Sequence, residues 1–484
     1  MIHETCLIFD LPQAGANPNR LIRKCDVEKP NFKEVYNADF LRQEELNIPN
    51  LAEIQVVRHY TNLSVKNYGV ENGPYPLGSC TMKYNPKVNE DLAALPGFVN
   101  THPLQPVETV QGNLKLLFSL QEKLNDIFGM DTFTFQPSAG AHGELTGIMM
   151  IKAYHESRND NKRRIMLIPD SGHGTNPASA AMAEFKVREI KSNMYGRVDI
   201  EDLRNKLDDT VAGIMLTNPN TLGLFEKDVQ EITDLVHQAG GLCYYDGANA
   251  NAILMQTRPG DMGFDVVHLN VHKTFSTPHG GGGPGAGPVG VKKILKPFLP
   301  KPVIIKKDDK YSLDFNRPQS IGQVRAFTGS FGIYVRTYAY ILAYGSSGLA
   351  EVSEAAVANA NYILERVRAS YHLPYEEAAM HEFVISAKWQ KEENGIKTID
   401  IAKRLIDYGF HPPTVYFPLI VAEAMMIEPT ETETLEGLEA LADAFNKIAE
   451  EAEANPELLE KAPHNMPITR PDETQAARKP ILKQ

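Results

Sequence analysis

Long hydrophobic runs, a signal sequence and clustered basic residues are all missing from this chain of 484 residues. No uninterrupted apolar segment approaches the roughly 20 residues that a helix needs to cross a bilayer. The amino terminus also lacks the basic start and long apolar segment of a signal peptide. The 49 basic residues are outnumbered by 61 acidic ones and form no stripe, which argues against nucleic acid or a membrane as a partner. We therefore expect a soluble cytoplasmic protein.

Cysteine is scarce, and none of its four positions forms a CxxC pair. The residues are Cys6, Cys25, Cys80 and Cys243. Their wide spacing indicates free thiols in a reducing compartment and disfavours both a disulfide framework and a structural zinc site.

The chain is too long for one ordinary core, so we expect two or three structural units. Residues 1–105 show little helical periodicity and predict an extended arm that wraps around something. Residues 106–340 predict a large domain, 341–462 a smaller α+β domain, and the proline-containing residues 463–484 an extended tail. A helix is expected over 109–128, since apolar residues recur at helical spacing before Gly129.

Short apolar runs alternate with helical patterns in the large domain. The runs are RRIMLIPD, VAGIMLT, GGLCYYD and FDVVHLNV, and the helical stretches include VDIEDLRNKLDD and EKDVQEITDLVHQAG. This alternation predicts right-handed βαβ units around a mostly parallel sheet. The smaller domain is expected to contain a long helix over SSGLAEVSEAAVANANYILERVRAS, short strands around HEFVISA and TVYFPL, and a final helix over LEGLEALADAFNKIAEEAE.

A lysine stands where a buried strand gives way to a glycine-rich stretch. In VVHLNVHKTFSTPHGGGGPGAGPVGV, the apolar run ends at His272 and Lys273, and seven glycines follow between Gly280 and Gly290. Most lysines are solvated surface residues. A lysine at the end of a buried strand is a better candidate for chemistry.

Two further segments supply the groups that such a lysine would need. Small residues in QPSAGAHGELTG precede a helical pattern, so the backbone at Ser138, Ala139 and Gly140 is suited to an anion such as phosphate. Asp246 ends another buried strand, the edge at which open α/β sheets bind ligands. Taken alone, the segment QPSAGAHGELTG could be an ordinary loop, and Asp246 could cap a helix.

Together the three parts match the requirements of pyridoxal phosphate: an anion cradle, an acid for the ring nitrogen and an amine for a Schiff base. His142 could lie over the ring, and His272 could act in proton transfer or on the phosphate. Thr328 and Ser330 in RAFTGSFG could add phosphate contacts, although a plain turn explains that segment equally well.

The histidines of these loops also permit a metal site. They are His142, His173, His272 and His279. No HExxH or tight ligand pair is present, and a metal hydrolase has no use for Asp246 and Lys273. We therefore expect no metal. A structural subunit with a vestigial pocket remains a second alternative, against which the retained lysine argues.

The motif set resembles one family of fold type I pyridoxal phosphate enzymes, the glycine decarboxylases, or P-proteins, of the glycine cleavage system. The resemblance runs from about residue 50 to about residue 450. It rests on PLGSCTMKYNP, QPSAGAHGE, DSGHGTNPASA, YYDGANANAI, NVHKTFSTPHGGGGPGAGPVGV, FHPPTVYFP and EPTETE. The chain length and the lysine-bearing half resemble the second of the two subunits into which this enzyme is split in many bacteria and archaea.

The resemblance implies roles for the residues above: the Schiff base on Lys273, the ring nitrogen on Asp246, stacking by His142 and phosphate contacts at 138–140. It also implies an α2β2 assembly with a homologous subunit 1, glycine as the substrate, and transfer of the aminomethyl group to a lipoyl arm on H-protein. Another fold type I enzyme, such as a lyase, aldolase or aminotransferase for a different amino acid, stays open as an alternative.

One conspicuous segment, GPYPLGSCTMKYNP, lies outside the expected large domain. Its polar side chains at Ser79, Thr81, Lys83 and Asn85 could reach the active site, toward the glycine carboxylate or the lipoyl entry. A structural turn with ordinary caps accounts for them as well. Cys80 is expected to be a free buried thiol.

Overall fold

A computed structural model describes residues 6–11, 27–28, 30–44, 48–280 and 285–482. The chain divides into two compact units, Met1–Asn72 and Gly73–Gln484. Cys6, Cys80 and Cys243 are free thiols, and Cys25 lies outside the described residues. The predicted boundaries at 105, 340 and 462 stay predictions.

The first unit contains four helices among its described residues. They are η1 (Ile8–Asp10), α1 (Phe32–Val35), η2 (Ala38–Phe40) and α2 (Glu53–Ser64). Along α2, Ile54, Val57 and Tyr60 follow one another at intervals of three residues, and each is more than half exposed. An apolar stripe at helical spacing normally faces a neighbour.

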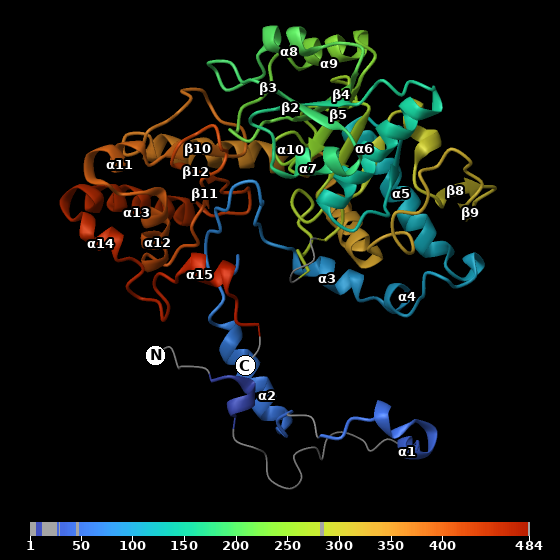
Figure 1. The fold of residues 1–484 in the computed structure, drawn as a ribbon, viewed down its shortest axis with the longest axis horizontal. Coiled ribbons are helices and arrows are strands. Elements are labelled where there is room, and N and C mark those ends of the chain that lie inside the picture. Colours follow the sequence, from blue (N-terminus) through green and yellow to red (C-terminus); the bar gives the residue numbers. More distant parts are fainter. Residues whose placement is uncertain (1–5, 12–26, 29, 45–47, 281–284, 483–484) are drawn as a thin grey trace. The chain divides into compact units, whose positions relative to one another are not determined.

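A seven-stranded sheet forms the centre of the second unit, in the order β1-β7-β6-β5-β4-β2-β3 (Figure 1). Its strands are β1 (Thr132–Thr134), β2 (Ile165–Pro169), β3 (Lys186–Ile190), β4 (Val211–Thr217), β5 (Leu242–Gly247), β6 (Val266–Leu269) and β7 (Val289–Val291). The pairs β2/β3, β2/β4, β4/β5 and β5/β6 are parallel, whereas β7 runs antiparallel to β6 and β1. The predicted mostly parallel sheet is confirmed.

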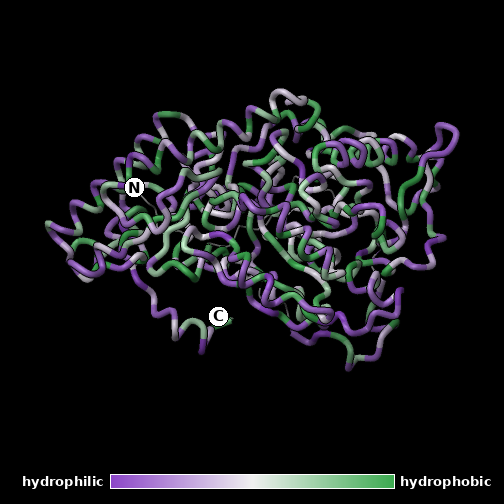
Figure 2. The backbone as a smooth tube through the Cα atoms, turned by 90° about the horizontal axis from the view of Figure 1, so that it is seen from above, coloured by the Kyte–Doolittle hydropathy of each residue, from purple (hydrophilic) through white to green (hydrophobic). Residues whose placement is uncertain are grey.

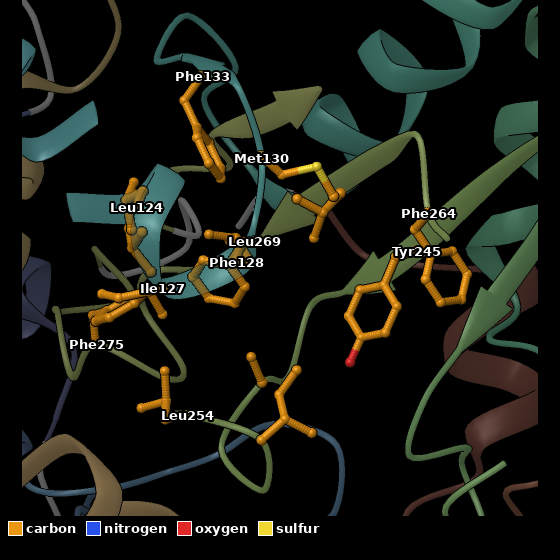
Figure 3. Close-up of a cluster of buried hydrophobic side chains, with 14 of the residues drawn as sticks. Leu124, Ile127, Phe128, Met130, Phe133, Tyr245, Leu254, Phe264, Leu269 and Phe275 are labelled. Atoms are coloured by element: carbon orange, nitrogen blue, oxygen red, sulfur yellow. The ribbon is translucent and has the colours of Figure 1, made fainter. Parts of the chain in front are cut away.

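Helices cover both faces of this sheet. They are α5 (Gln111–Phe128), α6 (Gly140–Ser157), α7 (Thr175–Met182), α8 (Ile200–Lys206) and α9 (Val229–Gln238). Successive strand residues point to opposite faces, so Tyr245 packs in the core under α5 and α9, and Tyr244 packs in the core under α6. Figure 3 shows the first of these cores, with Phe128, Phe133 and Tyr245 among its side chains. Burial on both faces explains why the strands are continuous apolar runs.

A three-stranded antiparallel sheet, ordered β10-β12-β11, organises the last part of the second unit. Its strands are β10 (Phe383–Ser386), β11 (Thr414–Val415) and β12 (Ala424–Ile427), and the helices are α10 (Phe331–Val367), α11 (Lys388–Asn394), α12 (Thr398–Asp407), α13 (Leu435–Ala454) and α14 (Pro456–Glu460). Figure 1 shows α11 and α13 beside β10 and β12. β12 was not among the predicted strands.

The long helix starts earlier than the pattern from Ser346 predicts, because α10 begins at Phe331. Gly345 interrupts it with φ 62° and ψ −172°, so the expected helix is the part that follows this break. Further elements are α3 (Lys87–Ala93), α4 (Pro96–Val99), η3 (Val107–Thr109), η4 (Lys293–Phe298), the hairpin β8 (Val303–Lys307) and β9 (Lys310–Asp314), and α15 (Glu473–Arg478).

None of the described helices combines the length and the apolar character needed to cross a membrane. Figure 2 shows the corresponding pattern, in which hydrophobic and hydrophilic stretches alternate at short intervals along the backbone.

Candidate active site

The sheet brings Asp246 and Lys273 to the same edge. Asp246 is the penultimate residue of β5, and β5 pairs in parallel with β6, Asp246 lying opposite His268. Lys273 follows β6 in a turn closed by a hydrogen bond from its own backbone N–H to the Asn270 carbonyl, at 2.9 Å. Its side chain is partly exposed. The carboxyl ends of adjacent parallel strands are the expected ligand-binding edge of such a sheet.

Asp246 is a buried anion with several partners. It is 3% exposed and accepts hydrogen bonds from Asn176 Nδ2 at 2.9 Å and from the Ala248 backbone N–H at 3.0 Å. Burial alone raises the pKa of this carboxyl, but His268 and the hydrogen bond from Asn176 outweigh it, so the net pKa is lowered. The carboxylate is therefore ionised at neutral pH.

His268 connects Asp246 to a tyrosine. Its Nε2 lies 3.5 Å from Asp246 Oδ1, and its Nδ1 lies 2.5 Å from the Tyr244 hydroxyl. Burial lowers the pKa of His268, so the ring is neutral, with the Tyr244 hydroxyl donating to Nδ1 and Nε2–H facing Asp246. These contacts from Tyr244 through His268 hold the Asp246 carboxylate in place without neutralising its charge. The negative charge is therefore available to a cationic ring nitrogen.

The predicted anion cradle forms the start of α6. Ala139 caps this 18-residue helix in an extended conformation, and Gly140 is its first residue. A Cβ atom on Gly140 would lie 2.1 Å from Asn270 Oδ1, and one on Gly287 would lie 2.0 Å from the Ala139 carbonyl oxygen. The glycines thus let the backbone of the cradle pack directly against the lysine turn and the strand that follows it.

Ser138 and His142 contact each other across the first turn of α6. Both the Ser138 backbone nitrogen and its hydroxyl lie 3.2 Å from His142 Nδ1. Burial and the nearby charge of Arg325 lower the pKa of His142, so the ring is neutral.

The segment after residue 320 also reaches the cradle. The Val324 backbone N–H donates to Gln136 Oε1 at 3.2 Å, and Thr328 borders a small pocket together with Gln136. Arg325, whose charge acts on His142, was not identified from the sequence. Its guanidinium donates to the Ser330 hydroxyl at 2.8 Å. Arg325 is the first residue of RAFTGSFG, three positions before Thr328, and this position was the signal that could have identified it.

His272 is buried beside the lysine. It is 4% exposed, its ring faces His279 edge-on at 5.0 Å, and its Nδ1 has no hydrogen-bond partner among the described residues. Burial, His279 and Lys273 together lower the pKa of His272 to about 3. The imidazole is neutral at physiological pH.

The four loop histidines do not gather into a metal-ligand set within the described residues. The groups whose ligand atoms lie within 4.8 Å of one another are instead His237, Cys243 and Asp265, and His381, Glu382 and Glu428.

The segment 73–86 contacts the turn that carries Lys273. Lys83 Nζ is buried in an ion pair with Glu431 at 2.6 Å and donates to the Thr274 carbonyl at 2.8 Å. Asn85 Nδ2 donates to the Ser276 carbonyl at 2.9 Å. Lys83 therefore stabilises the turn that carries Lys273, and Glu431 balances its charge.

Ser79 and Thr81 point toward two buried glutamates. Both adopt left-handed backbone conformations, with φ 64° and 49°, which is unusual for a β-branched threonine. The Ser79 N–H donates to Glu382 Oε2 at 2.7 Å, and the Thr81 hydroxyl donates to Glu428 Oε1 at 2.7 Å. Neither glutamate was identified from the sequence, although both lie in quoted motifs.

Comparison with known proteins places this site in a family. Residues 352–467 match the model for the glycine dehydrogenase C-terminal domain, and residues 146–286 match the model for class-V aminotransferases. The chain is 59% identical over 477 residues to a probable glycine dehydrogenase (decarboxylating) subunit 2 of Caldanaerobacter subterraneus subsp. tengcongensis, covering 99% of this chain and 98% of that relative. A relative of the same description from Alkaliphilus oremlandii is 60% identical over 477 residues, with the same coverage.

The fold has solved counterparts. An inhibitor-bound glycine decarboxylase (P-protein) of the glycine cleavage system superposes with a TM-score of 0.72 at 20% identity, over 86% of this chain and 94% of that one. A NifS-like protein superposes with a TM-score of 0.60 at 16% identity, over 78% and 99%. These likenesses confirm the predicted fold type I architecture, and the sequence identities show that the chain belongs to the family of glycine dehydrogenase (decarboxylating) subunit 2 proteins.

Proposed function

We propose that this chain binds pyridoxal phosphate at Lys273 and is the decarboxylating subunit of a glycine cleavage system. In this reaction glycine loses its carboxyl group as carbon dioxide, and the aminomethyl group passes to the lipoyl arm of H-protein. The observation that carries the proposal is the placement of Asp246 and Lys273 at the ends of two neighbouring parallel strands, in a chain 59% identical to a relative named for this activity.

The residues present fit the cofactor. The start of α6 offers free backbone N–H groups and the positive end of a helix dipole to a phosphate. Gly140 and Gly287 keep side chains out of this cradle. Asn270 Oδ1 and His272 Nδ1 are buried polar atoms without partners among the described residues, as expected where a polar group binds. Thr328, which borders a pocket with Gln136, and Arg325, whose charge acts on His142, would complete the phosphate contacts.

When bound, pyridoxal phosphate supplies a carbonyl that condenses with amines and a protonated ring that accepts the electron pair released at the α-carbon. Asp246, ionised and fixed by Asn176 and His268, would keep the ring nitrogen protonated through an ion pair. His142, being neutral, can stack on a cationic ring without repelling it.

Lys273 would hold the cofactor covalently, with His272 beside it. The pKa of about 3 makes His272 a neutral ring and a weak base, which favours a contact with the phosphate over proton transfer. Lys83, Asn85 and the Thr274 carbonyl keep the lysine turn in place.

The designation subunit 2 implies a second kind of subunit. We propose a homologous subunit 1 in an α2β2 heterotetramer, located in the cytoplasm and served by lipoylated H-protein. The exposed apolar stripe of α2 in the first unit supports a role for that unit in contacting another chain.

Absorbance spectroscopy of the chain with pyridoxal phosphate, with and without subunit 1, tests the proposal together with an exchange assay of glycine carboxyl carbon against labelled bicarbonate. A band of lysine-linked cofactor that shifts on adding glycine, and exchange that depends on both subunits, are the expected results. Exchange with another amino acid but not glycine would favour a different fold type I enzyme. No band even with subunit 1 present would favour a non-catalytic subunit.

A further inference from the structure

Lys83 is a buried cation with a complete set of partners. Its side chain is fully buried, and an ammonium group has three N–H donors. Three acceptors lie around it: Glu431 Oε1 at 2.6 Å, the Thr274 carbonyl at 2.8 Å and Asn251 Oδ1 at 3.1 Å. With its three donors directed to three acceptors of the protein, Lys83 is suited to holding structure and not to binding a ligand.

The three acceptors come from different parts of the chain. Thr274 directly follows Lys273, Asn251 lies shortly after the end of β5, and Glu431 lies shortly after the end of β12. Glu431 also accepts a hydrogen bond from Asn251 Nδ2 at 3.0 Å, which closes the network. We refer to Lys83, Asn251 and Glu431 as the clamp. The clamp joins the turn that carries Lys273 to segments that follow strands of both sheets.

The same turn contains a residue in an unfavourable conformation. Ser276 has φ 51°, in the left-handed region that favours glycine, and such a conformation persists only where the surrounding structure enforces it. Asn85 Nδ2 donates to the Ser276 carbonyl at 2.9 Å, and the Ser276 hydroxyl donates to the Tyr84 carbonyl. The two residues that follow Lys83 in sequence therefore help to hold the turn as well.

The hydrogen bonds around Lys273 act on the backbone. The Lys273 N–H donates to the Asn270 carbonyl at 2.9 Å, and the Lys273 carbonyl accepts from the Ser276 N–H at 3.1 Å. Lys83 adds the bond to the Thr274 carbonyl, one residue further on. These contacts fix the point from which the Lys273 side chain extends without restraining its amine.

We propose that the clamp is a positioning device that sets where the Lys273 amine meets the cofactor. Lys83 fixes the peptide that follows Lys273, and Glu431 holds Lys83 in place. Lys83 and Glu431 act through this turn, so they are positioning residues and not catalytic ones. The inference rests on the proposed function of Lys273.

Precise placement matters because the Lys273 amine has to leave the cofactor when a substrate amine binds and return to it afterwards. A misplacement of about 1 Å can lower a rate by about 10²-fold. An ion pair suits this task, because a hydrogen bond from an ammonium group is stronger than one between neutral groups.

Hydrogen–deuterium exchange of the cofactor-free protein, assembled with subunit 1, tests the clamp independently of activity. In the wild type we expect slow exchange at the hydrogen-bonded N–H groups of Lys273, Ser276 and Thr277. Lys83→Met keeps an unbranched side chain but removes the donors. Exchange at these three positions should become about 10-fold faster or more, as expected for the loss of one hydrogen bond from a charged group.

Unchanged exchange in Lys83→Met would overturn the inference. Rapid exchange of the turn already in the wild type would do the same, and this result is obtained even if the variant does not fold. Asn85→Ala is a milder change at a partly buried position. It removes the bond to the Ser276 carbonyl and should accelerate exchange at the turn to a smaller extent.

A paired variant separates positioning from stability. Lys83→Met alone leaves the Glu431 carboxylate buried without its cation, which destabilises the fold. Lys83→Met combined with Glu431→Gln removes both charges, so denaturant titrations should show recovered stability. Exchange at the turn should stay fast, because no ammonium group donates to the Thr274 carbonyl. Recovery of slow exchange together with stability would show a merely structural role and would overturn the inference.

Formation of the lysine-linked cofactor gives a further readout. After mixing with pyridoxal phosphate, the absorbance band should appear about 10²-fold more slowly in Lys83→Met and in the paired variant than in the wild type. Arg197→Met is the matched control, because Arg197 is a buried cation that pairs with Glu377 and donates to the Phe225 carbonyl. It should lose stability but form the band at the wild-type rate.

A wild-type rate of band formation in both Lys83 variants would overturn the inference. Absence of any lysine-linked cofactor in the wild type, with slow exchange at the turn, would instead overturn the proposed function.

Discussion

Two regions of this molecule hold a buried carboxyl group at the end of a sheet, and the pKa values of the two groups are shifted in opposite directions. At the end of the seven-stranded sheet, Asp246 has a lowered pKa. At the end of the three-stranded sheet, Glu382 has a pKa raised well above its usual value. The two side chains are 3% and 4% exposed, so burial does not explain the difference.

The partners of each acid explain it. Asp246 faces His268 and receives hydrogen bonds from Asn176 and Ala248, which together favour the anion. Glu382 receives one backbone hydrogen bond and faces a second carboxyl group. The first region thus holds an ionised carboxylate, and the second holds a carboxyl group that burial and a neighbouring acid keep protonated.

Removing the lysine at the end of the seven-stranded sheet should have the largest effect. Lys273→Ala should lose the absorbance band of the lysine-linked cofactor and reduce carboxyl exchange to the background without enzyme. Lys293→Ala, an exposed lysine 20 positions later, is the matched control and should keep both signals. Retention of the band in Lys273→Ala would show that another group holds the cofactor.

Removing the negative charge of Asp246 should have the next largest effect. Asp246→Asn keeps the size of the side chain but removes the charge that holds the ring nitrogen protonated. We expect the turnover number to fall by about 10²–10³-fold, the usual loss for one positioned electrostatic contact. Steady-state kinetics and cofactor content measured on the same preparation check this. An unchanged turnover number would remove Asp246 from the mechanism.

Adding a side chain at the start of α6, where the phosphate is proposed to bind, should have a smaller effect. In Gly140→Ala the new Cβ atom would lie 2.1 Å from Asn270 Oδ1, so the lysine turn must move. Overpacking of this kind costs about 1–3 kcal/mol, and the affinity for pyridoxal phosphate should fall as well. Gly174→Ala, at the start of α7, meets nothing within 4 Å and is the control. Equal cofactor affinity in both variants would contradict the proposal that residues 138–140 bind the phosphate.

The smallest expected effect is a change in how the stability of the fold depends on pH, and it distinguishes Asp246 from Glu382. Asp246, with a lowered folded pKa, stabilises the fold above its unfolded pKa, and this stability is lost as the pH falls through the folded value. Asp246→Asn should therefore lose its stability difference from the wild type in acid.

Glu382 should show the opposite behaviour. Its folded pKa is raised, so its stabilisation is present below the unfolded value and is lost as the pH rises toward the folded value. Glu382→Gln should consequently gain stability relative to the wild type as the pH rises. Denaturant titrations across the pH range measure both differences, and parallel profiles for the two variants would contradict the assigned ionisation states.

The two regions also differ in how far the sequence predicts them. Asp246 and Lys273 end apolar runs, and the periodicity of those runs predicts strands whose carboxyl ends share an edge. β2, β4, β5 and β6 form where the four apolar runs predict them, and α5 ends at Gly129 as expected. The local sequence pattern was sufficient for Asp246 and Lys273 because each of them lies at the end of the strand that positions it, or directly after it.

The meeting of Glu382 and Glu428 depends on contacts between distant parts of the chain. Glu382 and Glu428 meet through the register of β10 and β12, and β12 is a four-residue strand that a short apolar run does not distinguish from a helix. Their donors, Ser79 and Thr81, lie about 300 or more positions away in sequence. The sequence left open whether the segment 73–86 reaches the site or forms an ordinary turn, and tertiary packing alone decides that it binds these acids.

Borohydride reduction of the assembled holoenzyme, followed by peptide mass spectrometry, tests the central claim most directly because it fixes the cofactor to the residue that holds it. We predict a pyridoxyl group on Lys273 in wild-type protein. Its appearance on Lys83, the buried lysine that contacts the same turn, or on any other lysine would contradict the account.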